Sequence, residues 1–199
     1  MKRTILALIP VLALLQACYV TRYVPAGGYR LSAIISPDGQ RHDPGRYGWK
    51  DTVVGLMAEI TPSFVAVHVA NHTRKEMTVR WDLALYTDHY GKTHHAMHVD
   101  RLATTEEETR LPETLAPSQV SEGVVTMEGK ARYRQEWMFE PLVIFSENYT
   151  TEEQARQHFS RFGPVRLSVP LETAEGLMGY TLEFTPGELT VEKIKLYER

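Results

Sequence analysis

The sequence predicts a mainly β protein, built as one antiparallel β-sandwich with a single short helix. Three observations lead to this prediction. Apolar and polar residues alternate with a period of two in several segments, as in half-buried strands. Turn-forming Gly, Pro, Asn and Asp residues separate these segments at intervals suited to antiparallel neighbours. A convincing helical period is found in one place.

Four segments show the alternation most clearly. In the first, Val65, Val67 and Val69 fall on one face of a strand and His68 falls on the other. Pro170 lies inside another, so we expect that strand at a sheet edge, where a missing N–H is tolerated. The four segments are 64–69, 79–85, 165–171 and 178–184, and weaker patterns cover 30–36, 52–60, 94–102, 120–127, 142–145 and 189–196.

The helix is predicted over about residues 151–162. The run 150–153 reads TTEE, which has the composition of a capping box. Ala155, Phe159 and Phe162 share one face at helical spacing, and the pair Gly-Pro at 163–164 ends the pattern. We therefore expect a short helix packed on or beside the β-domain.

Length and composition limit the classes of protein that remain. A chain of 199 residues suits one domain. Hydrophobic residues make up 43% and charged residues 24%, which argues against wholesale disorder and against many membrane spans. The formal net charge of −3 provides no basic surface of the kind that nucleic-acid binding needs. We expect no nucleic-acid partner.

The N-terminus has the pattern of a secretory signal. Lys2 and Arg3 precede an apolar run at 5–15, which is shorter than the roughly 20 residues of a membrane span. Residues 15–18 read LQAC and resemble the lipobox of bacterial lipoproteins. The resemblance implies that Cys18 is lipidated on its thiol, becomes the first mature residue and is then acylated, for example with palmitate. The alternative is ordinary signal cleavage near Ala17, which leaves a spare thiol.

The lipobox resemblance also implies a cellular address. Cys18 is the only cysteine, so an intramolecular disulfide is impossible, and several acyl chains on it would provide a stable membrane anchor. Tyr19 stands where lipoproteins retained in the inner membrane typically have Asp, which favours the outer membrane and the periplasmic side. The expected organisation is a signal peptide at 1–17, a lipidated tether at 18–29 and a β-sandwich domain at 30–199.

The middle of the chain contains an apolar strand ending in NHT at 71–73, followed by VRWD at 79–82, YTD at 86–88 and PS at 117–118. This arrangement resembles the immunoglobulin-like sandwiches of uncharacterised bacterial envelope lipoproteins. The cysteine pair of true immunoglobulin domains is missing, although Trp81 is suited to a core position. A transthyretin-like sandwich would show nearly the same pattern and stays open as an alternative topology.

Histidines are concentrated between residues 89 and 98, where four of the eight lie. On a strand His94 and His98 share one face, and His89 or His72 from a neighbouring strand would be needed to complete a metal site. Imidazole ligands suit copper or zinc, so His89, His94 and His98 are candidate ligands. The run has no tight ligand spacing such as HExxH, and the alternative is a solvated hairpin with polar side chains on its outer face.

A second candidate site is the basic and aromatic run KARYRQEW at 130–137. Arginine and aromatic residues are enriched at protein interfaces, so Arg132, Arg134 and Trp137 are candidate protein-interaction residues. The alternative is that Tyr133 and Trp137 are core residues of an irregular strand.

The sequence indicates no recognisable catalytic motif. A GxSxG motif does not occur, and the run YGKT at 90–93 lacks the first glycine of a phosphate-binding loop. We therefore expect a non-enzymatic lipoprotein that is a structural or protein-interaction module of the cell envelope, with an envelope protein as partner. The alternative is a periplasmic copper or zinc protein that uses the His-rich hairpin. An enzyme with dispersed catalytic residues is the third hypothesis.

Overall fold

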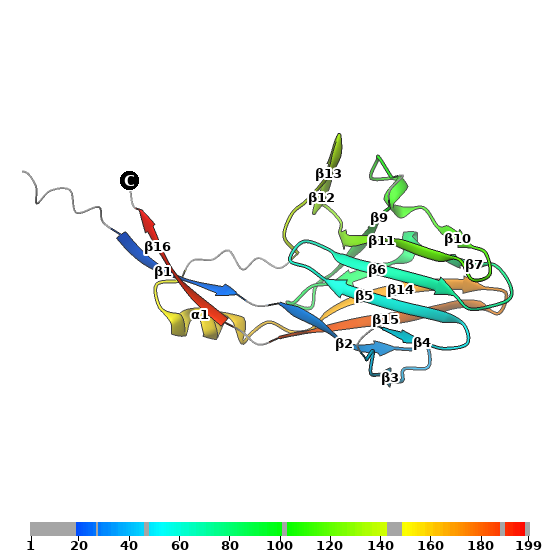
Figure 1. Ribbon diagram of the computed structural model, residues 1–199, viewed down its shortest axis with the longest axis horizontal. Helices are drawn as coiled ribbons and strands as arrows, with labels where there is room; N and C mark the ends of the chain where they lie inside the picture. Colours follow the sequence, from blue (N-terminus) through cyan, green and yellow to red (C-terminus); the bar gives the residue numbers. More distant parts are fainter. Residues whose placement is uncertain are drawn as a thin grey trace, which may run out of the picture.

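Figure 1 shows the chain as an elongated molecule in which a narrow ribbon extends from a body of curved β-sheet. This computed structural model describes residues 19–26, 28–45, 48–100, 103–142, 149–187 and 190–197. Strands dominate the described residues, which contain one α-helix, and this confirms the mainly β prediction.

Most strands belong to one large antiparallel sheet. Its main path runs β3-β2-β15-β14-β8-β9-β11-β6-β5-β4, and β7 joins β14 to β10. These strands are β2 (Tyr29–Ile35), β3 (Arg41–His42), β4 (Trp49–Lys50), β5 (Val54–Ile60), β6 (Val65–Asn71), β7 (Met77–Val79), β8 (Leu85–Thr87), β9 (Thr93–Val99), β10 (Glu113–Leu115), β11 (Val120–Met127), β14 (Val165–Thr173) and β15 (Gly176–Pro186).

The large sheet curls until its two ends almost meet. Its shape is nearly that of a barrel, and β2 contacts β5 across the remaining seam. The rings of His42 on β3 and Trp49 on β4 stack with their centres 4.6 Å apart, which bridges the two end strands. The immunoglobulin-like arrangement of two separate sheets is not confirmed by this path.

Alternating side chains of the strands fill the core. Val65, Val67 and Val69 on β6 are buried, and so are the inward residues of β14 that pair with β15. Burying an aliphatic side chain of this size contributes about 1.5–3 kcal/mol, so these alternating rows supply much of the driving force for folding. Trp81 is also buried in this core, as the sequence indicated.

The segment predicted as one strand at 79–85 is divided into three pieces. After β7, the chain forms the short 3-10 helix η2 (Trp81–Leu83) and then enters β8. The backbone N–H of Leu83 bonds to the carbonyl of Arg80 at 2.9 Å, which replaces strand pairing by a local turn. The prediction was wrong in the middle of the segment. A tight turn buries Trp81 just as a strand would, so the alternation of apolar and polar residues does not distinguish the two structures.

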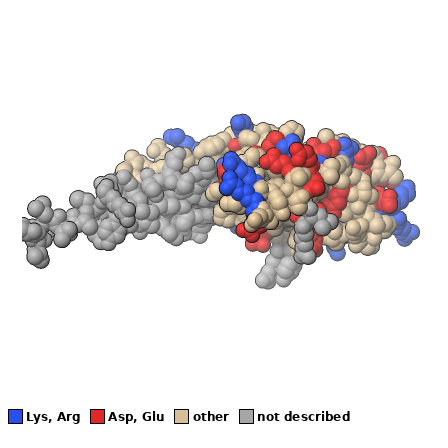
Figure 2. Space-filling model, turned by 90° about the horizontal axis from the view of Figure 1, so that it is seen from above, with Lys and Arg blue, Asp and Glu red and all other residues tan. Residues whose placement is uncertain are grey.

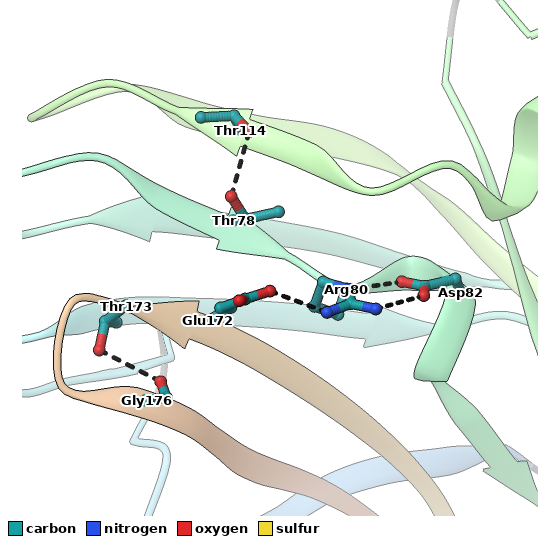
Figure 3. A network of polar contacts seen from close by, with 7 residues as sticks. All are labelled: Thr78, Arg80, Asp82, Thr114, Glu172, Thr173 and Gly176. Atoms are coloured by element: carbon teal, nitrogen blue, oxygen red, sulfur yellow. Dashed lines mark hydrogen bonds and ion pairs between the residues drawn. The ribbon is translucent and has the colours of Figure 1, made fainter.

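Arg80 holds this turn against the neighbouring strand (Figure 3). Its Nε and a terminal nitrogen donate to the two carboxylate oxygens of Asp82, and its other terminal nitrogen donates to Glu172 at 2.8 Å. Nearby, the hydroxyls of Thr78 and Thr114 are 3.1 Å apart and join β7 to β10. A bidentate guanidinium contact fixes both distance and orientation.

Pro170 lies in the interior of the sheet, so the prediction of an edge strand was wrong. β14 pairs with β15 along one side, while its other side pairs with β8 through residue 168 and with β7 from Leu171 onward. Pro170 falls at this change of partner, and its carbonyl accepts the backbone N–H of Arg80 at 2.9 Å. The missing N–H of proline is tolerated because no ladder partner is required at that point.

The α-helix α1 (Glu152–Phe159) confirms the predicted helix. Thr151 caps it, because its hydroxyl accepts the backbone N–H of Gln154 at 3.2 Å. The helix ends about one turn earlier than predicted, yet Phe162 remains buried after it. In the described residues, no helix is both long and apolar enough to span a bilayer.

The ribbon seen in Figure 1 is a separate two-stranded sheet of β1 (Tyr19–Ala26) and β16 (Thr190–Tyr197). The expected tether at 18–29 therefore contains a regular strand from residue 19. Local patterns did not indicate this strand, because its partner lies at the opposite end of the chain. Helix α1 packs beside this ribbon.

Candidate functional site

A third, small sheet projects from the body of the molecule in Figure 1. It is the hairpin of β12 (Ala131–Arg134) and β13 (Glu136–Phe139), in which Arg132 pairs with Met138 and Tyr133 pairs with Trp137. Gln135 forms its tip with a φ of 67°, a left-handed conformation that is uncommon for a residue with a side chain. One face of the hairpin contacts the body of the molecule, and the other face is exposed.

The inner face attaches the hairpin to the body. The indole N–H of Trp137 donates to the carbonyl of Ala103 at 2.7 Å. The ring of Phe139 lies 5.3 Å from that of Phe64, centre to centre, and Ala131 is fully buried. These contacts hold the projecting element in one orientation.

The outer face presents two guanidinium groups, a thioether and the carboxylate of Glu136, which pairs with Arg134 across the hairpin. The side chain of Arg132 is 66% exposed, and Met138 is 56% exposed. Arg132, Arg134, Met138, Phe139 and Glu140 surround a hollow of about 230 Å³. We call this face, defined by Arg132, Arg134 and Met138, the hairpin surface.

The charges of the hairpin surface are only partly neutralised. Glu140 lies 3.5 Å from Lys130 and 3.8 Å from Arg132. Arg134 has no ion-pair partner within 4.0 Å among the described side chains. On the side from which the hairpin projects, Figure 2 shows a compact group of Lys and Arg atoms next to a broader group of Asp and Glu atoms. The hairpin surface thus carries two exposed guanidinium groups next to the carboxylates of Glu136 and Glu140.

The structure divides the predicted interaction residues. Arg132 and Arg134 lie together on the outer face, as expected for a surface site. Trp137 is half-buried on the opposite face, so it positions the hairpin and is not part of the exposed surface. Met138 was not among the predicted residues. Side chains alternate along a strand, so Met138 faces outward while its neighbour Trp137 faces inward.

The three candidate metal ligands are placed in three different surroundings. His94 Nε2 lies 3.3 Å from Asp88, at the start of β9. His89 is buried against Tyr90 and Phe162 with ring centres 4.0 and 4.3 Å apart. In the described part of the chain, no three His, Cys, Asp or Glu side chains come together as a group that could hold a metal ion.

His98 is buried inside the body. Its ring stacks on Trp81 with centres 4.0 Å apart and planes within 7°. Its Nε2 is buried without a hydrogen-bond partner, and Gly123 leaves the space that this nitrogen occupies. Burial lowers the pKa of His98, while the charges of Glu113 and Asp100 act in the opposite direction. A neutral imidazole is therefore favoured, and its stacking on Trp81 is a packing contact.

Cys18 and the lipobox at 15–18 lie outside the described residues. The first described strand, β1, begins directly after them at Tyr19. The predicted lipidation therefore remains a sequence-based prediction.

Comparison with models of protein families, with curated proteins and with solved structures found no match to this chain.

Proposed function

We propose that this protein is a non-enzymatic module of the bacterial cell envelope that binds an acidic segment of an envelope protein through the hairpin surface. The observation that supports this most directly is the contrast between the two faces of the hairpin. The inner face is fixed by Trp137 and Phe139, while Arg132, Arg134 and Met138 are left exposed.

The residue types of the hairpin surface suit protein recognition. Arginine and methionine are enriched at interfaces, and arginine binds carboxylates through two parallel hydrogen bonds. The thioether of Met138 is flexible and polarisable, so it can adapt to an apolar partner side chain. Because the hairpin is already held in place, binding costs less ordering than it would on a mobile loop.

Lipid on Cys18 is proposed to anchor the protein to the outer membrane, on the periplasmic side. The ribbon supports this arrangement, since β1 begins one residue after Cys18 and leads into the body. A strand of this length extends about 25 Å at roughly 3.3 Å per residue, which would separate the sheet and its hairpin from the bilayer.

Anchoring is tested with the substitution Cys18→Ser. We expect wild-type protein to sediment with outer membranes and to carry a lipid mass, and the variant to lose the lipid. Mass spectrometry of the mature N-terminus measures both outcomes. A wild-type protein that begins at residue 18 with an unmodified thiol would refute the anchor and leave the partner proposal standing.

Partner binding is tested by photo-crosslinking at the hairpin surface in cells. A photoreactive residue at Met138 should capture an envelope protein, and the additional changes Arg132→Glu and Arg134→Glu should abolish the adduct. Leu177 is the matched control, because it is 59% exposed compared with 56% for Met138 and lies in the distant β14–β15 hairpin. The same adducts at both positions, or none at Met138, would contradict the proposal.

We retain two finer interpretations as proposals. The antiparallel pairing and the buried Trp81 support a distorted immunoglobulin-like topology, which a comparison of an experimental structure with such domains would test. The metal-binding alternative has support only from the close approach of His94 to Asp88 at 3.3 Å. One imidazole and one carboxylate are fewer ligands than a copper or zinc site normally has.

A further inference from the structure

A groove lies on the outer face of the sheet where β4, β5, β6 and β11 run side by side. Strand register produces its floor, because Gly55 pairs with Ala70 and Ala70 pairs with Val120. The next outward row consists of larger residues, in which Met57 pairs with His68 and His68 with Glu122. A row of small side chains beside a row of large ones creates a hollow across the strands.

The groove has the size and surface of a small-molecule site. Its volume is about 510 Å³, within the range of about 300–1,000 Å³ that is usual for ligand pockets. Met57 and Val120 provide its exposed apolar side chains, and both are more than 40% exposed. A ligand that covers these apolar side chains removes them from water, which favours binding.

Two glycines are needed for this shape. Gly48 has a φ of +104°, and a Cβ there would lie 2.3 Å from the carbonyl oxygen of Leu56. A Cβ at Gly55 would lie 2.9 Å from Nε2 of His72. The first glycine lets the chain turn close to β5 before Trp49, and the second gives the imidazole of His72 a place over the floor.

The polar groups of the groove have defined roles. His72 Nδ1 lies 3.1 Å from the carbonyl oxygen of Asp51, and since a carbonyl only accepts, Nδ1 donates. In a neutral ring Nε2 of His72 is then an acceptor. The groove is also lined by one carboxylate, that of Glu122, which is 62% exposed and lies 3.4 Å from Nδ1 of His68.

Lys50 is the cationic side chain among the described residues that line the groove. It lines the hollow and is exposed, and it has no ion-pair partner among the described residues. The neighbouring Asp51 is engaged elsewhere, because its carboxylate accepts the backbone N–H groups of Val53 and Val54 and the hydroxyl of Tyr180. The groove therefore combines an apolar hollow with a lysine on β4 that has no ion-pair partner among the described side chains, while the groove's carboxylate, that of Glu122, lies on β11, beyond β5 and β6.

We propose that this groove binds an amphipathic organic anion, meaning a compact apolar or aromatic body that carries one carboxylate or sulfonate group. The apolar body covers the floor between Met57 and Val120, and the anionic group lies beside Lys50. This site is separate from the hairpin surface, and either proposal can fail without the other.

The test uses the aromatic sulfonate dye 8-anilinonaphthalene-1-sulfonate and the mature chain, residues 18–199 with Cys18→Ser. We expect saturable binding of one dye per chain by fluorescence and calorimetry. Ala70→Leu, which fills the floor, should weaken binding at least tenfold. Lys50→Gln should weaken it about two- to fivefold, as expected for a partly exposed charge pair, and should reduce its salt dependence.

Three controls distinguish the groove from general dye adsorption. Lys75→Gln removes an exposed lysine outside the groove, and the pair Arg132→Gln and Arg134→Gln removes the charges of the hairpin surface. Both proteins should bind the dye as the wild type does. Amide chemical shifts should change at Gly55, Ala70 and Val120, which reports the location even if Ala70→Leu lowers stability.

Several results would overturn the proposal. These are the absence of saturable binding, undiminished binding by a folded Ala70→Leu protein, loss of binding only in the hairpin variants, or shift changes that leave the floor of the groove unaffected. Unchanged affinity in Lys50→Gln would reject the anionic class of ligand.

Discussion

Asn71 shows how one buried polar residue can organise the end of a strand. It is fully buried, and its side-chain amide donates to the carbonyls of Lys75 and Leu115 at 2.8 and 2.9 Å. Its Oδ1 accepts both the backbone N–H and the hydroxyl of Thr73. Asn71 thus joins the end of β6, the turn that follows and the end of β10.

The first prediction concerns this residue. Asn71→Ala should lower the free energy of unfolding by about 2–3 kcal/mol, because buried carbonyls and N–H groups would lose their partners. Denaturant unfolding followed by circular dichroism measures the change. Thr114→Val is the control, since it affects an exposed hydroxyl pair and should stay within about 0.5 kcal/mol of the wild type. Equal effects of the two substitutions would show that Asn71 has no special role.

His89 makes stability depend on pH. Its imidazole is buried with Nδ1 unpartnered, and burial lowers its pKa in the folded protein. The nearby charge of His158 acts in the same direction and that of Asp88 opposes it. The unfolded chain therefore binds a proton more readily than the folded protein does.

The second prediction follows from the lowered pKa of His89 in the folded protein. Stability should fall as the pH decreases from the ordinary histidine pKa of about 6.5 toward the lowered folded value, by at most about 1.4 kcal/mol per pH unit for one proton. His89→Phe should flatten this dependence, while His98, whose pKa is also lowered, keeps its own contribution. Thermal unfolding between about pH 7.5 and pH 5 measures the difference. An unchanged slope in His89→Phe would contradict the assignment.

The third prediction concerns the metal alternative. His89, His94 and His98 have separate surroundings. Calorimetric titration with copper or zinc should therefore show no tight binding site that depends on these histidines, which the substitutions His94→Ala and His98→Ala test. A stoichiometric site that these substitutions remove would restore the metal-binding function. Such a result would also require the buried ring of His98 to leave Trp81.

At the scale of single elements, the hairpin β12–β13 depends on the backbone at its tip. Gln135 has a φ of 67°, which costs a residue with a Cβ about 1–2 kcal/mol and costs glycine little. The fourth prediction is that Gln135→Gly preserves cross-linking from Met138, whereas the β-branched Gln135→Val weakens it. Equal cross-linking by both variants would mean that this hairpin geometry is not needed for partner binding.

Element boundaries show what local patterns omit. The predicted strand at 79–85 became β7, η2 and β8, because Arg80 turns the chain and binds both Asp82 and Glu172. Pro170 was expected at an edge but lies where β14 exchanges β8 for β7. The second difference arises from strand neighbours that are remote in sequence, whereas the first combines a local turn with the remote contact from Arg80 to Glu172.

At the scale of the whole molecule, the ribbon and the body are separate sheets. The fifth prediction is that residues 28–187 keep a cooperative, β-dominated fold without β1 and β16. Isolated two-stranded sheets are only marginally stable, and the main core contains residues of the body. Circular dichroism and thermal unfolding of this fragment measure the result. A chain that no longer unfolds cooperatively would show that the ribbon is part of the folding unit.

Sequence patterns by themselves were sufficient for the mainly β class, three of the four clearest strands, the capped helix and the outward position of Arg132 and Arg134. These features depend on contacts within a few residues, where side-chain alternation and capping act directly. The lipobox at 15–18 remains a sequence prediction.

Only the tertiary structure decided which residues meet. It separated the three histidines, turned Trp137 inward, paired β1 with β16 and placed Gly55 beside Ala70 to form the groove. Each of these depends on the pairing and register of strands far apart along the chain. A one-residue shift in register would turn every side chain of a strand to the other face, and local patterns do not report register.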